Sequence, residues 1–97
     1  MSWRLSRAAE DDLIGIWLQG AERHGAAQAD RYHDGLGATF ELLWAFPEMA
    51  RERTELTPPL RAHPFGVHVI LYLVRPDASI LVARVRHKRE DWMTDPL

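Results

Sequence analysis

The sequence predicts an α+β fold, built as one domain over residues 1–97, in the order strand, helix, helix, strand, strand, strand. Three observations favour this order. Apolar residues recur at helical spacing between residues 13 and 43, and they alternate or run on through the segments after residue 60. A polar segment bounded by prolines, residues 47–59, separates the two patterns. We therefore expect a helical hairpin packed on one face of a small antiparallel sheet.

The first two elements are a short strand and the helix that follows it. Trp3 and Leu5 alternate with polar neighbours, which is typical of a strand with one buried face. Ser6 stands at the N-cap of the helix, and Gly25 takes the position that ends it. The apolar residues of this helix cover an arc of roughly 200°, about twice the usual core-facing stripe.

That wide apolar arc predicts a surface for a partner. It contains Leu13, Ile14, Ile16, Trp17 and Leu18. Ile14 and Leu18 project away from the stripe formed by the others, so they should be partly exposed on an isolated monomer. An amphipathic helix of another protein could cover them.

The second helix is predicted from about Ala26 to Phe46. Its apolar residues are spaced 3, 4, 4 and 3 positions apart and form one stripe: Ala29, Tyr32, Leu36, Phe40 and Leu43. Pro47 should end it. Since only a short turn separates the two helices, they should form an antiparallel hairpin.

Three strands are predicted after the polar segment, at 60–65, 67–74 and 79–87, and the connection RPDA makes the last two a hairpin. The alternation along the last strand should divide its side chains between two faces. We expect the helices to be faced by Leu81, Ala83 and Val85, and the uncovered side of the sheet to carry Ile80, Val82, Arg84 and Arg86.

Charge is unevenly distributed along this chain of net charge −2. Residues 1–50 hold four arginines against eight acidic residues, a balance of −4, whereas residues 51–97 hold eight cations against six acids, a balance of +2. This composition argues against general or sequence-specific affinity for nucleic acid. The cations that gather at the end of the last strand favour a surface that binds an acidic partner. The alternative is a solvated strand end that adds little to stability.

Several functional classes receive no support. The chain contains no cysteine, which excludes disulfides and thiolate metal sites. His63 and His68 lie five residues apart without a third ligand, so we expect no metal and no cofactor. We find no apolar run of membrane-spanning length and no signal peptide, and we expect a cytoplasmic protein.

The ordered series LSRAAEDDLIGIW, Gly25, the apolar stripe up to Pro47, LR at 60–61, HVILYLV and RVRHKREDW resembles the ParE branch of the RelE/ParE toxin superfamily over nearly the whole chain. The resemblance implies the toxin of a bacterial type II toxin–antitoxin system of the kind that stabilises plasmids. Such a toxin would inhibit DNA gyrase by binding, without catalytic residues of its own. A ParD-like antitoxin would form a hetero-oligomer with it, wrapping it with its C-terminal segment.

The candidate sites follow from the resemblance and the patterns together. We expect the target to be bound by Arg61, Arg84, Arg86, His87, Lys88, Arg89 and Trp92, and the antitoxin by Ile14, Trp17 and Leu18. The alternative for Arg61 and Arg84 is a structural ion pair or packing over apolar surface. For Trp92 it is a ring folded back over the core.

Two other functions stay open. RelE-like relatives cut messenger RNA on the ribosome, which requires a general base, a general acid and cations over the scissile phosphate. Glu55, Arg61 and His87 could supply those groups, whereas Tyr72 lies in an apolar strand and is expected in the core. The chain could also be an inactive toxin fold that only pairs with its antitoxin.

Overall fold

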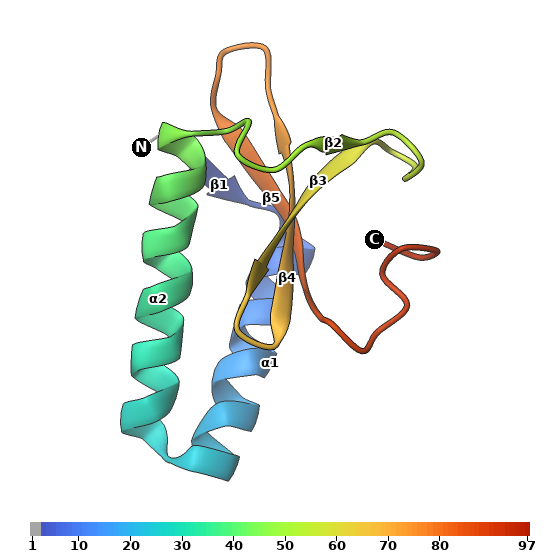
Figure 1. The fold of residues 1–97 in the computed structure, drawn as a ribbon. Coiled ribbons are helices and arrows are strands. Elements are labelled where there is room, and N and C mark those ends of the chain that lie inside the picture. Colours follow the sequence, from blue (N-terminus) through green and yellow to red (C-terminus); the bar gives the residue numbers. More distant parts are fainter. Residues whose placement is uncertain (1–2) are drawn as a thin grey trace.

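The computed structural model describes residues 3–97 and confirms the α+β fold. Its elements are β1 (Trp3–Leu5), α1 (Arg7–His24), α2 (Ala26–Ala45), β2 (Glu52–Arg53), β3 (Leu60–Phe65), β4 (His68–Val74) and β5 (Ile80–His87). The two helices form an antiparallel hairpin on one side of a twisted sheet, and the C-terminal segment lies on the other side (Figure 1). None of the helices within residues 3–97 has the length and apolar character needed to cross a membrane.

The sheet is mixed, whereas the sequence predicted an antiparallel one. Its strand order is β1-β5-β4-β3-β2, and β1 pairs parallel to β5, with Trp3 opposite Ile80 and Leu5 opposite Val82. The alternation in a three-residue strand carries no information about its direction, which explains the error. The two-residue β2 lies in the segment predicted as a loop and pairs antiparallel with β3.

Local signals set the helix boundaries as predicted. The Ser6 Oγ accepts a hydrogen bond from the Ala9 N–H at 3.0 Å, which makes Ser6 the N-cap of α1. Gly25 has φ of 89°, a left-handed conformation that suits glycine, and its N–H donates to the Ala21 carbonyl at 2.9 Å. The same residue starts α2, so a single glycine turns the chain between the two helices.

The main core lies between the hairpin and the sheet. It is formed by Ala9, Leu13, Leu36, Phe40, Leu43, Ile70, Tyr72, Ile80, Val82 and Val85. Each large side chain buried there stabilises the fold by about 1.5–3 kcal/mol. Tyr72 is fully buried, as predicted, and its hydroxyl donates to the Pro47 carbonyl at 2.8 Å, so no polar atom is left unpaired.

A β-bulge reverses part of the predicted alternation in β5. Tyr72 pairs with Val82 and Leu71 pairs with Arg84, which leaves Ala83 as the extra residue. Before the bulge, Ile80 and Val82 face the helices, and Leu81 lies opposite Leu73 on the other side, so the prediction for these residues and for Ala83 is wrong. After the bulge the prediction holds for Val85, Arg84 and Arg86, because one added residue shifts the alternation by one.

The sheet face away from the helices is covered, although we expected it to be open. A second cluster lies there, formed by Leu56, Leu60, Val69, Leu71 and Ala83, with Ala62, Leu73 and Trp92 packed against it. Leu56 comes from the segment before β3, and Trp92 comes from residues 88–97, which we name the C-terminal tail. This face therefore carries a small second core.

Side chains occupy the edge of β5 that β1 leaves free. The Ser6 Oγ donates to the Ala83 carbonyl at 2.6 Å, Asp12 accepts from the Val85 N–H at 2.9 Å, and Glu90 accepts from the His87 N–H at 2.8 Å. Thus Ala83, Val85 and His87 of β5 each have a main-chain group bonded to a side chain outside the strand. At the opposite side of the sheet, β2 pairs only with Leu60 and Arg61 of β3. Pro64 lies farther along β3, where its missing N–H breaks no hydrogen bond of the sheet.

Candidate functional site

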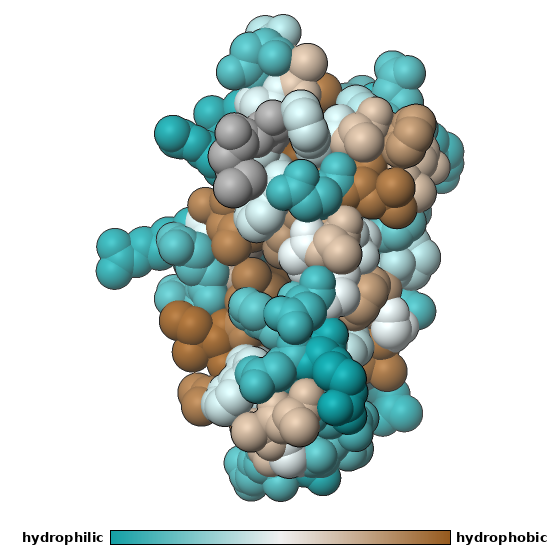
Figure 2. Space-filling model, turned by 90° about the vertical axis from the view of Figure 1, so that its left-hand side faces the viewer, coloured by the Kyte–Doolittle hydropathy of each residue, from teal (hydrophilic) through white to brown (hydrophobic). Residues whose placement is uncertain are grey.

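An apolar groove on α1 contains the residues predicted to bind the antitoxin. Ile14 and Leu18 are 60% and 58% exposed, which confirms the predicted exposure. They line a groove of about 510 Å³ together with Leu5, Glu10, Leu13, Trp17 and His33. Figure 2 views the molecule from the side of α2 and shows hydrophobic surface interrupted by hydrophilic side chains.

Trp17 lines this groove and is held in place. It is half-buried, and its Nε1 donates to the Asp30 Oδ1 at 2.8 Å, which joins α1 to α2. The groove thus has a fixed aromatic side chain beside two exposed aliphatic ones. That arrangement suits a partner helix that inserts its own apolar residues.

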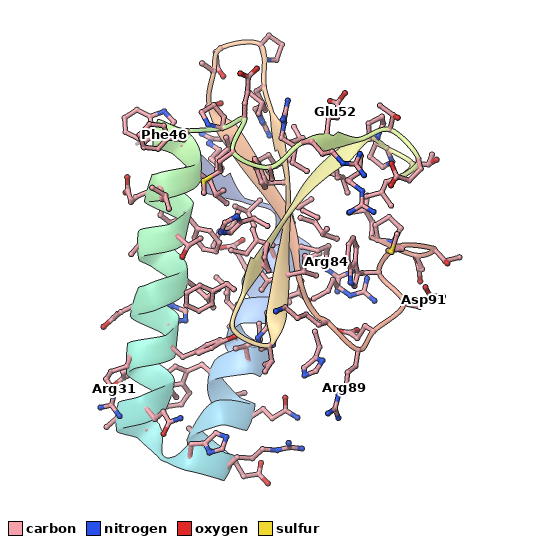
Figure 3. All side chains as sticks on the ribbon, viewed as in Figure 1. Arg31, Phe46, Glu52, Arg84, Arg89 and Asp91 are labelled. Atoms are coloured by element: carbon pink, nitrogen blue, oxygen red, sulfur yellow. The ribbon has the colours of Figure 1, made fainter. Side chains whose placement is uncertain are left out.

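Arg84 binds other parts of the chain and is not free for a target. Its Nε and Nη2 donate to the two carboxylate oxygens of Asp12 at 2.7 and 2.8 Å, and its Nη1 donates to the Leu97 carbonyl at 2.6 Å. Its side chain is 20% exposed, and the bond to Asp12 raises its pKa. Figure 3 shows Arg84 between the sheet and the C-terminal tail. Arg84 therefore forms the structural ion pair named as its alternative.

Arg86 also holds the tail. Its guanidinium lies 3.2 Å from the Glu90 carboxylate, and its Nη1 donates to the carbonyls of Asp95 and Pro96 at 2.8 and 3.2 Å. The bond from the His87 N–H and the bond from Arg86 both lower the pKa of Glu90. Arg84 and Arg86 lie on the predicted face, but the tail covers them.

The remaining residues of the basic cluster differ in their surroundings. His87 is half-buried, and its ring centroid lies 5.4 Å from that of His68. Lys88 and Arg89 are exposed, and Figure 3 shows Arg89 directed away from the sheet. These two cations are the part of the cluster that solvent and a partner can reach.

Trp92 packs against the second cluster, as its structural alternative stated. It is partly buried, and the Arg53 guanidinium lies 5.8 Å from its ring centroid, within cation–π range. Met93, the next residue, is 51% exposed. Trp92 therefore anchors the tail to the sheet and is not a free apolar side chain.

Comparison with known proteins identifies the family. The model of the family described as "ParE toxin of type II toxin-antitoxin system, parDE" matches residues 3–92. The chain belongs to the ParE toxin family. This confirms the type II toxin–antitoxin toxin predicted from the resemblance.

Two relatives of this ParE-family chain agree with that result. Toxin ParE1 of Caulobacter vibrioides is 35% identical over 86 residues, which cover 89% of this chain and 88% of that toxin. A solved chain described as "Chromosomal ParDE TA system from P. aeruginosa" superimposes with a TM-score of 0.74 at 18% identity. It covers 90% of this chain and 95% of the other, and it shows the same fold.

The ParE-family chain does not bring together the residues proposed for a nuclease. Arg61 is on the helix side of β3, where its Nη1 donates to the Ala50 carbonyl at 2.6 Å. Arg61 pairs with Tyr72 and His87 pairs with His68, so they lie at opposite ends of β4, about 13 Å apart at 3.3 Å per residue. Glu55 bonds to Arg53 at 2.7 Å, which lowers the pKa of Glu55. Arg61 is thus also separate from the basic cluster.

Sequence reasoning missed a second apolar surface of this ParE-family protein, at the C-terminal end of α2. Leu42, Phe46, Met49 and Val74 are exposed there, with Phe46 at 62%. A groove of about 550 Å³ is lined by Ala45, Phe46, Pro47, Glu48, Met49, Arg61 and Val74. The sequence pointed to this surface only weakly, through Leu42 and Phe46, which lie four residues apart at the predicted end of the helix.

Proposed function

We propose that this ParE-family toxin inhibits DNA gyrase by binding, in the bacterial cytoplasm, and that a ParD-like antitoxin neutralises it in a hetero-oligomer. Membership of the ParE toxin family over residues 3–92 carries the proposal. The separation of Glu55, Arg61 and His87 also favours a toxin that binds over one that cuts RNA.

The antitoxin is proposed to bind the groove on α1. Ile14 and Leu18 lie one helical turn apart, so a single amphipathic segment can contact both. Covering an exposed aliphatic side chain completely contributes about 1.5–3 kcal/mol. Trp17 adds an aromatic ring whose position is already fixed by Asp30. The groove therefore offers a compact hot spot for a helix.

The target is proposed to contact Lys88 and Arg89 with the adjacent His87. These side chains stand at the start of the C-terminal tail, where they can attract an acidic surface of gyrase. Arg84, Arg86 and Trp92 would act through the tail, because their contacts hold it against the sheet. Arg61 lies on the other side of the sheet and would contribute to the fold.

The decisive experiment measures gyrase supercoiling with the purified toxin, beside the DNA-damage response and transcript integrity in cells that express it. Inhibition of supercoiling with intact transcripts supports the proposal. Cleavage of messenger RNA before any DNA damage would instead favour a RelE-like nuclease, and harmless expression would favour an inactive fold. A Lys88→Ala, Arg89→Ala variant should inhibit gyrase less, whereas an Arg51→Ala variant, which removes an exposed cation elsewhere, should not.

The two proposed surfaces can be tested separately. An Ile14→Lys, Leu18→Lys variant should escape the antitoxin while it still inhibits gyrase. A Leu42→Lys variant places a charge on the other apolar surface and should bind antitoxin normally. Antitoxin binding that survives the first variant would show that α1 is not the docking site, whatever the target.

A further inference from the structure

A small, half-open pocket lies where α1, α2 and the far ends of β4 and β5 meet. It has a volume of about 280 Å³ and is lined by Ile16, Gln19, Gly20, Arg23, His24, Gln28, Ala29, Tyr32, Val67, His68 and His87. Among these described lining residues none is acidic, although the chain as a whole carries a net charge of −2.

His68 is the most buried polar residue of the pocket. It is 9% exposed, and its Nδ1 lies 2.7 Å from the hydroxyl of Tyr32, which donates a hydrogen bond to the Phe65 carbonyl at 3.1 Å. Within residues 3–97, His68 Nε2 has no protein partner, and no fully buried side-chain nitrogen or oxygen lacks one. Solvent must therefore reach Nε2, and His68 borders both this pocket and a wider neighbouring cleft.

His87 presents a second ring nitrogen to the same space. Its Nδ1 accepts a hydrogen bond from the Arg89 N–H at 3.0 Å, which puts the ring proton of the neutral form on Nε2. The ring centroids of His68 and His87 are 5.4 Å apart. Neutral His87 thus offers an Nε2–H donor at one wall, with Arg23 and His24 on α1 as further donors. Because the Tyr32 hydroxyl donates to Phe65, His68 donates to Tyr32 through Nδ1, and its Nε2 becomes a donor only when the ring is protonated.

We propose that this pocket binds a phosphate-type oxyanion. Arginine and histidine side chains supply charge-assisted hydrogen bonds to such a group, and Gln19 and Gln28 add amide donors. Gln28 belongs to the first turn of α2, whose N-cap residue, Gly25, offers no side-chain cap. The unpaired N–H groups of that turn carry partial positive charge. Arg23 lies in the last turn of α1, where the helix dipole places a partial negative charge of about one half. The full positive charge of the Arg23 side chain is larger than this partial charge.

The charges around the pocket make binding depend on pH and salt. His68 faces Asp12 of α1 and Glu90 after β5, and Asp11 and Glu22 line a wider adjoining cleft of about 570 Å³. These acids disfavour an anion, whereas the charge of Arg23 and of protonated His68 favours it. Burial, followed by repulsion from His87, lowers the pKa of His68. A bound anion should raise that pKa, so phosphate should bind more tightly as His68 gains its proton below about pH 6.5.

The experiment titrates the intact protein with inorganic phosphate and follows the imidazole resonances of His68 and His87 by NMR. Chloride and acetate at matched ionic strength serve as references. We expect phosphate alone to shift both resonances and to raise the pKa of His68. Equal shifts with chloride would reduce the effect to an adventitious ion only and overturn the site. Equal shifts with acetate would overturn its assignment to phosphate.

A matched pair of variants locates the binding. Arg23→Gln removes an exposed cation from the pocket wall, and Arg31→Gln removes an exposed cation from α2, which Figure 3 shows on the side away from the sheet. Losing one charged hydrogen bond should weaken phosphate binding by about tenfold or more in Arg23→Gln. Arg31→Gln should bind phosphate as the wild type does. Equal weakening in both variants would indicate a general charge effect and overturn the pocket.

Discussion

Replacing Asp12 tests whether one carboxylate joins the helical hairpin to the sheet edge. Asp12 accepts three hydrogen bonds, from Arg84 Nε at 2.7 Å, Arg84 Nη2 at 2.8 Å and the Val85 N–H at 2.9 Å. The side chains of Asp12 and Arg84 are 15% and 20% exposed, so water screens the pair only weakly. Asp12→Ala would leave a largely buried guanidinium and a strand-edge N–H without their acceptor.

The expected cost of Asp12→Ala is about 3 kcal/mol in the free energy of unfolding. Breaking a buried ion pair by removing one partner costs about 3–5 kcal/mol, and the remaining access of water to Arg84 favours the lower end. For a chain of this length the midpoint of thermal unfolding should fall by more than about 10 °C. Urea unfolding with an unchanged m-value gives the free energy directly.

Asp11 provides the matched control for Asp12. It is the neighbouring residue, carries the same charge and is exposed, so Asp11→Ala should change stability by no more than about 0.5 kcal/mol. A double-mutant cycle with Arg84→Ala should give a coupling energy of about 1–3 kcal/mol. If Asp12→Ala costs less than about 1 kcal/mol, or if the two substitutions simply add, the carboxylate does not hold the hairpin to β5.

Three further predictions concern the turn, the histidines and the tail. Gly66→Ala should destabilise the fold by at least about 1 kcal/mol, since φ is +54° and a Cβ would lie 2.6 Å from the Tyr32 hydroxyl; unchanged urea unfolding would contradict this. Because burial and His87 lower the pKa of His68 from its ordinary 6.5, the unfolded state binds more protons just below that pH. The free energy of unfolding should therefore rise with pH up to about 6.5–7, and the slope should shrink in His68→Gln if His68 is its source. Trp92→Ala should speed amide exchange and proteolysis in residues 88–97 while the helices stay protected, because Trp92 packs the tail against the sheet. Equal loss of protection in the tail and the helices would show that the tail does not open independently of the fold.

Local chemistry made the helices predictable. Ser6, Gly25 and Pro47 each act within a few residues of themselves, and the 3.6-residue period of α2 needs no knowledge of the sheet. The exposure of Ile14 and Leu18 follows from the same geometry, because a stripe of that width cannot all face one layer. This part of the candidate site could therefore be predicted from the sequence.

Contacts between distant residues explain what the sequence left unpredicted. Ala83 looks like any other member of an alternating strand, and the bulge arises only when β4 and β5 pair. Arg84 finds its acceptor 72 residues earlier in the chain, so its role as a structural ion pair cannot be distinguished locally from an exposed cation. The carbonyls that engage Arg86 belong to a tail without a periodic pattern.

The occupied flank of β5 has a consequence for the protein in the cell. An unprotected strand edge recruits strands of neighbouring chains and can seed fibres, above all when a protein accumulates without its partner. With Ser6, Asp12 and Glu90 bonded to its main chain, β5 offers no such template along residues 83–87. This edge should thus not join neighbouring molecules when the toxin outlives its antitoxin, and recognition along it is left to side chains on the helices and the tail.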